Sequence, residues 1–341
     1  MFSIEYLPGY QLSGKVDSFL KDWRSNSDFI VAHTSGSTGV PKEILLPKAD
    51  MLVSAKASNL RFGLTSESIL LCPLSPDYIA CKIMIVRALT ADCRLVLCQP
   101  ATAFMQSPAT REFLASQSVI DLLPIVPAQC QPLIGDPLLS KFRNIIIGGA
   151  PLTSAMEAAM LQADTANLFA TYGMTETCSH VALRRLGSNF YEAMPGISFD
   201  LDDRGCLRVI APSYSFKHLQ TNDIAKLASP TAFEWLGRFD NVINSGAVKL
   251  FPEEIEHKLE NLIPAPFIIR GIPSEKWGEE AAIVCLDDNP LSDNELLTIC
   301  RNNLTPYQVP KSVIRIPEFP LTSSGKLRRN FPISDSQRAS V

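Results

Sequence analysis

Four hydroxyl residues, two glycines and a lysine lie within the nine residues from Thr34 to Lys42. Gly36 and Gly39 permit backbone conformations that other residues avoid, which lets successive N–H groups approach an anion. The lysine adds a compact positive charge. The hydroxyl donors are Thr34, Ser35, Ser37 and Thr38. We interpret the segment as a phosphate-binding loop, and the alternative is a polar surface turn. It differs from a Walker loop, in which the lysine follows a glycine and not Pro41.

A second segment that can do chemistry, Tyr172-Gly-Met-Thr-Glu176, follows a short apolar run. The ring of Tyr172 can stack on a flat heteroaromatic base, a contact that contributes about 1–3 kcal/mol. Thr175 can bind a phosphate, and Glu176 can bind Mg²⁺, a cation that prefers oxygen ligands. The alternative is a core tyrosine followed by a helix N-cap at Thr175.

Two more polar residues lie further along the chain. Asp223 follows Gln220-Thr-Asn222, a sequence typical of a turn, and its carboxylate there can hold a ribose diol or simply organise the turn. Lys326 follows a glycine in the hydroxyl-rich segment 322–325. A solvent-exposed lysine is the alternative interpretation of that position.

The composition argues against several classes of protein. The 341 residues are enough for two domains of ordinary size, and the formal net charge is −4 with no basic run, which argues against a nucleic-acid surface. The longest apolar stretches fall short of the roughly 20 residues that span a bilayer. The first residues lack the pattern of an export signal, so we expect a cytoplasmic protein without a membrane partner.

The cysteines and histidines do not suggest a disulfide framework or a zinc site. The nine cysteines are an odd number and contain no C-x-x-C pair, which is typical of reduced, buried thiols in the cytosol. The four histidines have no partner at the spacing of metal ligands.

Alternating helices and strands are expected to position the polar residues of the first half. Helices are predicted at 16–23, 48–62 and 154–161 and within 73–89, and strands at 29–32, 68–72, 94–98, 119–123, 125–126 and 144–148. Gly63 is placed to end the second helix. The alternation predicts a doubly wound α/β layer, in which ligands bind at the carboxyl ends of strands. We expect the 34–42 loop and Gly148–Thr153 to lie at that edge.

After Phe190 the chain changes to short β-type runs at 207–210, 216–219 and 233–236. We place a domain boundary at Asp240, between residues 1–239 and residues 240–341. Beyond it, strands at 267–273, 280–286 and 312–316 and a helix at 291–304, capped by Ser292 or Asp293, predict a smaller α+β domain.

Four segments in this order resemble motifs of the acyl-adenylate-forming superfamily, which comprises acyl-CoA synthetases, peptide-synthetase adenylation domains and luciferases. They are 34–42 for its phosphate loop, 171–176 for its adenine motif, 237–246 for its hinge motif and 324–326 for its catalytic lysine. The resemblance covers nearly the whole chain. It implies a large N-terminal domain of layered α/β sheets that binds ATP and the acyl group, and a smaller, mobile α+β C-terminal domain that carries the lysine.

The resemblance also implies which residues bind the nucleotide and CoA. Tyr172 would stack on adenine, whose edge would lie against residues 148–151. Asp223 and Arg238 would contact the ribose, and Asp240 would be the hinge. The cofactor-binding set is Thr34, Ser35, Gly36, Ser37, Thr38, Gly39, Gly148, Gly149, Ala150, Pro151, Tyr172, Gly173, Met174, Asp223, Arg238, Asp240 and, where the thiol of CoA approaches, Ser245 and Gly246.

The chemistry of the superfamily implies the catalytic residues. A carboxylate attacks the α-phosphorus of ATP, pyrophosphate leaves, and the thiol of CoA then takes the acyl group. Such a transfer depends on positioning and charge neutralisation more than on a base. Thr175 would face the α-phosphate, Lys42 would bind phosphate in the loop and Glu176 would bind Mg²⁺. Lys326 would bridge the carboxylate and the phosphate, and only in the adenylating orientation of its domain.

Two features depart from the usual pattern of the superfamily. The N-terminal domain is much shorter, and Ser75–Lys82 stands in place of the aromatic-histidine motif of the acyl site. With the segment Met174–Arg185, these features are similar to the compact o-succinylbenzoate-CoA ligases of menaquinone synthesis. Because that acid keeps a second carboxylate, we expect a cation in the acyl pocket. Lys82 is our first candidate and Arg87 the second, with Tyr78 beside them.

Two other functions stay open at this point. The protein can act on another aryl or acyl acid, which ATP–pyrophosphate exchange with a panel of acids would distinguish. It can also be a nucleotide-binding regulator without catalysis. The presence of Glu176, Asp240 and Lys326 argues against a regulator, because a protein that only binds a nucleotide has no need of all three.

Overall fold

The structure is a computed structural model that describes residues 1–34, 42–162, 167–246, 248–320, 327–329, 331–332 and 338–339. Three parallel strands form one sheet: β1 (Ser3–Tyr6), β5 (Arg94–Leu97) and β4 (Ile69–Cys72). Three more parallel strands begin a larger sheet: β6 (Leu123–Ile125), β7 (Asn144–Ile147) and β8 (Asn167–Gly173). The Leu71 N–H donates to the Leu122 carbonyl at 3.1 Å, so the two parallel groups lie side by side.

Four of the five α-helices of this half lie where the sequence predicts them, and the helix at Pro108–Ser116 was not predicted. Helix α2 (Lys48–Phe62) ends as predicted, because Gly63 adopts a left-handed conformation with φ 63°. Helix α5 (Ser154–Leu161) has the predicted bounds, and Thr153 caps it by accepting from the Met156 N–H at 3.2 Å. The other α-helices here are α1 (Ser13–Arg24), α3 (Ile79–Ala91) and α4 (Pro108–Ser116). The 3₁₀ helices are η1 (Phe104–Gln106), η2 (Pro127–Gln129), η3 (Gln131–Leu133), η4 (Pro137–Lys141), η5 (Thr175–Thr177) and η6 (Phe239–Asn241).

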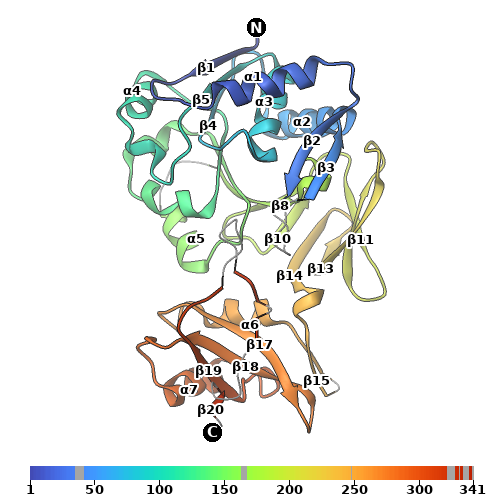
Figure 1. Ribbon diagram of the computed structural model, residues 1–341, viewed down its shortest axis with the longest axis vertical. Coiled ribbons are helices and arrows are strands. Elements are labelled where there is room, and N and C mark those ends of the chain that lie inside the picture. The colour runs from blue at the N-terminus through green and yellow to red at the C-terminus, as the bar shows by residue number, and fades with distance from the viewer. Residues whose placement is uncertain are drawn as a thin grey trace.

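Antiparallel strands complete the larger sheet, on the right of Figure 1. They are β9 (His180–Arg185), β10 (Phe190–Ala193), β11 (Ser198–Leu201), β12 (Cys206–Ala211), β13 (Lys217–Ser229) and β14 (Ala232–Arg238). The nine strands are ordered β11-β12-β13-β14-β10-β9-β8-β7-β6. The prediction of layered α/β sheets with a smaller second domain is confirmed.

The prediction that the strand at 29–32 belongs to the parallel layer is wrong. Strand β2 (Phe29–Thr34) pairs antiparallel with β3 (Lys42–Pro47), and the two form a separate hairpin. The inner face of the hairpin buries Ile30, Ala32 and Leu46 against the core. The 34–42 segment therefore connects two strands of a hairpin, not a sheet strand and a helix, and residues 35–41 lie outside the described part of the chain.

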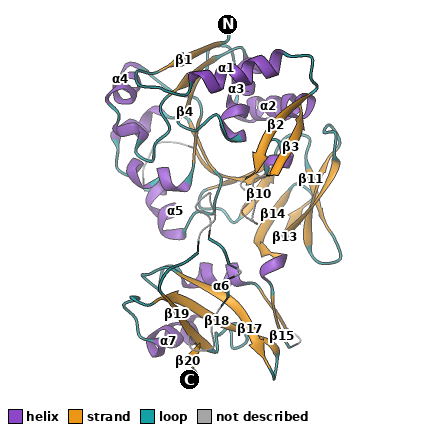
Figure 2. Cartoon of the chain, viewed as in Figure 1, coloured by secondary structure: helices purple, strands orange, loops and turns teal. Residues whose placement is uncertain are grey.

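The C-terminal part has its own sheet (Figure 2). Its strands are β15 (Ile243–Ser245), β16 (Val248–Leu250), β17 (Phe267–Ser274), β18 (Gly278–Leu286), β19 (Ser312–Ile316) and β20 (Arg338–Ala339), and its helices are α6 (Pro252–Leu259) and α7 (Asp293–Asn303). Of the two predicted caps of α7, Ser292 is the one used, in a capping box with Glu295.

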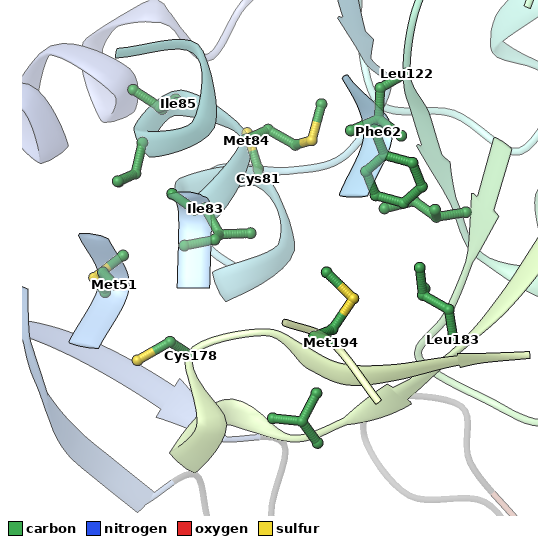
Figure 3. Close-up of a cluster of buried hydrophobic side chains, with 14 of the residues drawn as sticks. Met51, Phe62, Cys81, Ile83, Met84, Ile85, Leu122, Cys178, Leu183 and Met194 are labelled. Carbon is green, nitrogen blue, oxygen red and sulfur yellow. The ribbon is translucent and has the colours of Figure 1, made fainter. Parts of the chain in front are cut away.

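Separate hydrophobic cores lie on either side of residue 240. The largest core packs α2 and α3 against one face of the sheets, and Figure 3 shows Phe62, Met84 and Met194 within it. A second core packs α4 and α5 against the other face. The last buried residue of these two cores along the chain is Phe233, and the first buried residue of the two C-terminal cores is Ile243.

All nine cysteines of the sequence are free and buried. Burial raises the pKa of Cys98, Cys130 and Cys178 to about 12. Within the described ranges, no three His, Cys, Asp or Glu side chains are grouped as metal ligands. The described helices include none with the length and hydrophobicity that a bilayer crossing requires.

Candidate active site

The predicted adenine edge and Tyr172 lie at the same edge of the sheet. Strands β7 and β8 are parallel neighbours, with Ile147 opposite Ala170. Residues 148–151 follow β7, and Tyr172 and Gly173 are the last two residues of β8. Because the carboxyl ends of parallel strands meet at one edge, these predicted site residues are brought together, and Gly149, Ala150 and Pro151 are exposed there.

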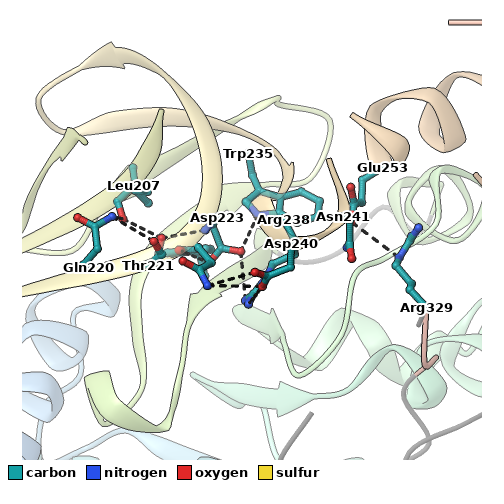
Figure 4. Close-up of polar contacts among 12 residues, drawn as sticks. Leu207, Gln220, Thr221, Asp223, Trp235, Arg238, Asp240, Asn241, Glu253 and Arg329 are labelled. Carbon is teal, nitrogen blue, oxygen red and sulfur yellow. Dashed lines mark hydrogen bonds and ion pairs between the residues drawn. The ribbon is translucent and has the colours of Figure 1, made fainter. Parts of the chain in front are cut away.

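Asp223 contacts two other predicted nucleotide-binding residues, Tyr172 and Arg238, and also Trp235. It accepts a hydrogen bond from the Tyr172 hydroxyl at 2.8 Å and from the Trp235 indole N–H at 3.3 Å. A guanidinium nitrogen of Arg238 lies 3.6 Å from the same carboxylate. Asp223 is only 6% exposed, so it is fixed by these partners (Figure 4). Trp235 was not predicted as a site residue, although it lies two residues from the buried Phe233 on the same face of β14.

The prediction that Asp223 lies in a turn is wrong. It lies inside the 13-residue strand β13, opposite Arg238 on β14. The polar residues Gln220-Thr-Asn222 continue the strand, because the Asp223 N–H donates to the Thr221 hydroxyl at 3.0 Å and that hydroxyl donates to the Leu207 carbonyl at 2.7 Å. Side-chain hydrogen bonds that are typical of a turn are made here within a strand.

The ring of Tyr172 has a defined orientation. It packs edge-on against Phe233 with 5.0 Å between ring centroids, and against Tyr191 at 5.9 Å. Burial, and then the charge of Asp223, raises the pKa of the Tyr172 hydroxyl above its ordinary value. The hydroxyl therefore remains a donor to Asp223 over the working pH range and keeps the ring fixed, as a stacking platform requires.

Asp240 lies in η6, between the last strand of the first part and the first strand of the second. Its carboxylate is 3.1 Å from a guanidinium nitrogen of Arg238 and 3.4 Å from the side-chain amide of Asn222. The predicted hinge residue is thus held from two strands, β13 and β14. Asn222 was not predicted as part of this contact.

Thr175 and Glu176 lie in η5, which contacts both strands of the β2–β3 hairpin. Thr34 and Lys42 form the last pair of that hairpin, so the segment between them begins next to η5. Glu176 is exposed, and Met174 starts the turn by donating its N–H to the Thr177 hydroxyl at 3.0 Å. The predicted phosphate and Mg²⁺ residues therefore lie at the mouth of the predicted phosphate loop.

The η5 turn folds back closely onto Gly173, and this contact yields a prediction. A Cβ at Gly173 would clash with the Ser179 carbonyl oxygen and lie 2.6 Å from the His180 Cα, both backbone atoms. Gly173→Ala is expected to lower the free energy of unfolding by about 2–3 kcal/mol, because the turn must move, and to abolish adenylation with it. Urea unfolding measures this.

Gly14 in α1 provides the matched control, since a Cβ there meets nothing within 4 Å. Gly14→Ala is expected to raise the free energy of unfolding by about 0.5–1 kcal/mol without a change in activity. Equal effects of the two substitutions would contradict the backbone contact described here.

The three predicted acyl-site residues lie in different surroundings on or before α3. Tyr78 precedes the helix and is 57% exposed. The Lys82 ammonium donates to the Val31 carbonyl of β2 at 3.1 Å, and burial lowers the pKa of Lys82. Arg87 is 1% exposed.

The guanidinium of Arg87 is buried without a carboxylate partner among the described residues. It donates to the Ser179 hydroxyl at 2.8 Å and lies 3.4 Å from His180 Nδ1, and its Nε has no hydrogen-bond partner in the described ranges. Burial lowers the pKa of Arg87 to about 10, so it stays charged at neutral pH. Burial, and then this charge, keeps the pKa of His180 well below its usual value. A buried cation without a carboxylate partner in the described part of the chain is costly unless an anion approaches it.

The C-terminal part docks on the first helix turn of α5. Glu260, which belongs to the C-terminal part, accepts from the Ser154 N–H at 3.1 Å and so satisfies a free N–H at the start of α5. His257 Nδ1 lies 2.8 Å from the Glu260 carboxylate and 3.2 Å from the Ser154 hydroxyl. The Glu157–Arg184 ion pair lies beside this contact. The sequence alone gave no signal for it, since Ser154 and Glu260 are 106 residues apart.

The His257–Glu260 contact is expected to make stability depend on pH. The hydrogen bond to Glu260, at the end of the same helix, raises the pKa of His257. The folded state therefore favours protonated His257, and this contribution to stability is present at low pH and lost as the pH rises through the raised pKa. The free energy of unfolding, measured by urea unfolding at a series of pH values, is expected to lose this contribution as the pH rises through the raised pKa of His257. His257→Gln should flatten this dependence, and an unchanged profile in that variant would refute it.

Two sets of predicted site residues are not seen next to Tyr172 and Asp223 in the described part of the chain. Ser245 ends β15, and Gly246 follows it with its N–H bonded to the Trp277 carbonyl at 2.7 Å; Figure 1 shows β15 at the far end of the C-terminal domain from β8. Lys326 lies outside the described residues, as do Ser35, Gly36, Ser37, Thr38 and Gly39.

Layered α/β sheets followed by a smaller C-terminal domain, with the cluster of Tyr172, Asp223 and Arg238 on the larger sheet, are typical of a two-domain nucleotide-binding enzyme. The model of the AMP-binding enzyme family matches residues 14–200, and that of the AMP-binding enzyme C-terminal domain matches residues 268–326. The chain belongs to the AMP-binding enzyme family. The resemblance inferred from the four motifs is confirmed.

The similar proteins differ in length. A 2-succinylbenzoate–CoA ligase of Listeria monocytogenes is 26% identical over 93% of this chain and 72% of its own length. The structure of an acyl-CoA synthetase (AMP-forming)/AMP-acid ligase II-like protein from Dyadobacter fermentans is 28% identical, with a TM-score of 0.63 over 94% of this chain and 93% of the other. The o-succinylbenzoate CoA synthetase of Bacillus subtilis, solved with its acyl-adenylate intermediate, is 20% identical with a TM-score of 0.76 over 88% of this chain and 67% of its own.

Proposed function

We propose that the protein is an AMP-forming acid–thiol ligase that adenylates o-succinylbenzoate with ATP and then transfers the acyl group to CoA. The name of the Listeria relative, which aligns with nearly the whole chain, supports this reaction. The observation that carries the choice of acid is the buried guanidinium of Arg87, which has no carboxylate partner among the described residues and donates to Ser179, three residues after Glu176. A substrate with a second carboxylate supplies the missing anion.

Arg87 replaces Lys82 as our first candidate for that second carboxylate. Lys82 already donates to the Val31 carbonyl and is only partly buried. The Nε of Arg87 has no hydrogen-bond partner among the residues that the structure describes, and Ser179 and His180 fix the guanidinium. Because a guanidinium only donates, His180 Nδ1 accepts from it and Nε2–H faces Ser58 at 3.4 Å. The four side chains form a buried polar cluster beside the apolar helices α2 and α3.

The adenylation site is proposed to use the residues near the ends of β8 and β14, in the adjacent part of β13 and in η5. Tyr172 stacks on the adenine, Asp223 and Arg238 bind the ribose hydroxyls, and Thr175 binds the α-phosphate. Lys42 binds the phosphates from the hairpin. Their contribution is to hold the acid and the α-phosphorus in line and to neutralise charge that develops as pyrophosphate leaves.

The donor set also fits Mg²⁺, which proteins hold through one or two carboxylates together with substrate phosphates. Glu176 is an exposed carboxylate at the mouth of the hairpin and would be its protein ligand. When bound, Mg²⁺ would neutralise part of the negative charge of the ATP phosphates. Lys326 would add a second cation between the acid and the α-phosphate.

The proposed domains are residues 1–239 and residues 240–341, with Asp240 as the hinge. The separate cores before Phe233 and after Ile243 support this division. Ser245 and Gly246 are assigned to the later step, in which the C-terminal domain turns and brings them toward the thiol of CoA.

ATP–pyrophosphate exchange tests the proposal. Exchange is expected with o-succinylbenzoate and weakly or not at all with benzoate and acetate, and CoA should then yield the thioester, which chromatography detects. Stronger exchange with benzoate or acetate would favour another acyl acid. Absence of exchange with every acid, at intact ATP binding, would make the protein a nucleotide-binding regulator.

A further inference from the structure

Arg329 is held on two sides by carboxylates of α6. Two of its guanidinium nitrogens donate to the two oxygens of Glu256, at 2.7 and 2.5 Å, in a bidentate pair. Its Nε lies 3.8 Å from Glu253. The side chains of Arg329 and Glu256 are 23% and 15% exposed, so the pair is largely screened from water. This arginine stands three residues after Lys326 in the sequence.

Both carboxylates are themselves fixed. Glu256 also accepts from the Ile269 N–H of β17 at 2.6 Å. Glu253 accepts from the side-chain amide of Asn241 at 2.5 Å, and Asn241 adjoins the hinge residue Asp240. Figure 4 shows Asn241, Glu253 and Arg329 next to one another, between the strands of the first domain and α6. The arginine is thus linked through α6 to the hinge.

The first turn of α6 lies tightly against the end of β14. A Cβ at Gly237 would lie 2.5 Å from a Glu253 carboxylate oxygen, and Gly237 has φ 145°, a conformation that disfavours other residues. That oxygen is buried and has no hydrogen-bond partner among the described residues. Glu253 therefore has little room to move relative to the hinge.

The chain on either side of 321–326 is anchored to the C-terminal domain. The Arg328 N–H donates to the Pro320 carbonyl at 2.8 Å, and Phe319 and Leu327 pack against the core that contains Ile268. Arg270 donates to the Phe331 carbonyl at 2.5 Å. In Figure 1 these dark red segments rise from the sheet of the C-terminal domain toward α6 and the first domain.

We propose that Arg329 is a positioning residue for adenylation, which fixes the chain that leaves Lys326 to the hinge through Glu256, Glu253 and Asn241. The inference rests on the proposed function, in which Lys326 acts on the acid and the α-phosphate. The pair orients the lysine segment when the domain is in the adenylating orientation. It has no role once the adenylate is formed, because that step uses the other orientation.

Arg329→Gln removes the ion pair and keeps hydrogen-bonding capacity. Adenylation, measured by pyrophosphate exchange, is expected to fall about 30- to 100-fold in kcat, the size of effect that an ångström of misplacement produces. The KM for ATP should change little. Thioester formation from a preformed acyl-adenylate should change less than about threefold. Arg329→Lys retains a charge without the two-pronged geometry and should be intermediate.

Two arginines serve as matched controls. Arg328 is the exposed neighbour, so Arg328→Gln makes the same charge change in the same segment and should leave both half-reactions within about threefold. Arg315 pairs with Asp293 at 2.9 Å in the same domain, with comparable exposure. Arg315→Gln should lower the melting temperature as Arg329→Gln does, without a selective loss of adenylation.

The Lys326→Ala background provides the decisive comparison. If Arg329 acts through the lysine, adding Arg329→Gln to Lys326→Ala causes no further loss of adenylation. A further loss of the full size, or an equal loss in both half-reactions, would make the arginine merely structural and overturn the inference. If Arg329→Gln behaves like Arg328→Gln, the inference fails while the function stands. If Lys326→Ala alone leaves adenylation intact, the proposed function fails at that residue instead.

Discussion

Lys326→Ala is expected to slow adenylation by about 100-fold or more, since a few kcal/mol of transition-state stabilisation is lost with the ammonium group. Its charge would bridge the attacking carboxylate and the α-phosphate, where negative charge accumulates as pyrophosphate leaves. Thioester formation from a preformed acyl-adenylate should survive. Rapid-quench measurement of the two half-reactions separates these effects.

Lys311 is a suitable control for this substitution, because it is an exposed lysine of the same domain that takes part in no proposed step. Lys311→Ala should leave both half-reactions unchanged. An equal loss in both steps for Lys326→Ala would contradict the account in which the C-terminal domain presents the lysine in one orientation and removes it in the other.

Arg87→Met is expected to lower kcat/KM for o-succinylbenzoate by about 100-fold, the cost of removing one charge from a buried ion pair. The same substitution should raise the free energy of unfolding of the unliganded protein by about 1–3 kcal/mol, because it removes a buried charge that lacks a carboxylate partner in the described ranges. Loss of activity with a gain in stability is the signature of a group kept for its ligand. Steady-state kinetics and urea unfolding measure the two.

The matched control is Lys82→Met on the same helix. Its ammonium contacts a backbone carbonyl near solvent, so the kinetics with o-succinylbenzoate should change only a few-fold. Adenylation of any acid without a second carboxylate should be equally weak in wild type and Arg87→Met. Unchanged kinetics of Arg87→Met, or a larger loss in Lys82→Met, would return Lys82 to first place.

Local signals predicted most of the α-helices of this protein, although not the one at Pro108–Ser116. The end of α2 at Gly63 and the cap of α7 at Ser292 depend on residues within a few positions, and the apolar periodicity of 48–62 needs no distant partner. The order of four motifs likewise gave the superfamily, because each motif is a short run whose residues act together.

Distant pairing explains what the sequence did not predict. Asp223 has the neighbours of a turn residue, but pairing of β13 with β14 and β12 overrides that local preference. The hairpin of β2 and β3 was mistaken for a strand of the parallel layer because a short apolar run does not identify its partner. On α3, Lys82 and Arg87 are the only charged residues, and only the packing of β9 and the hairpin shows which one is buried.

The burial of every cysteine has a consequence for a protein that makes acylating agents. An acyl-adenylate reacts with any accessible thiolate, and CoA can form mixed disulfides with an accessible thiol. None of the nine sulfhydryls in this chain is at the surface, and several have their ionisation suppressed. The incoming cofactor is then the one thiol able to intercept the activated acid, which protects the catalyst from modifying itself.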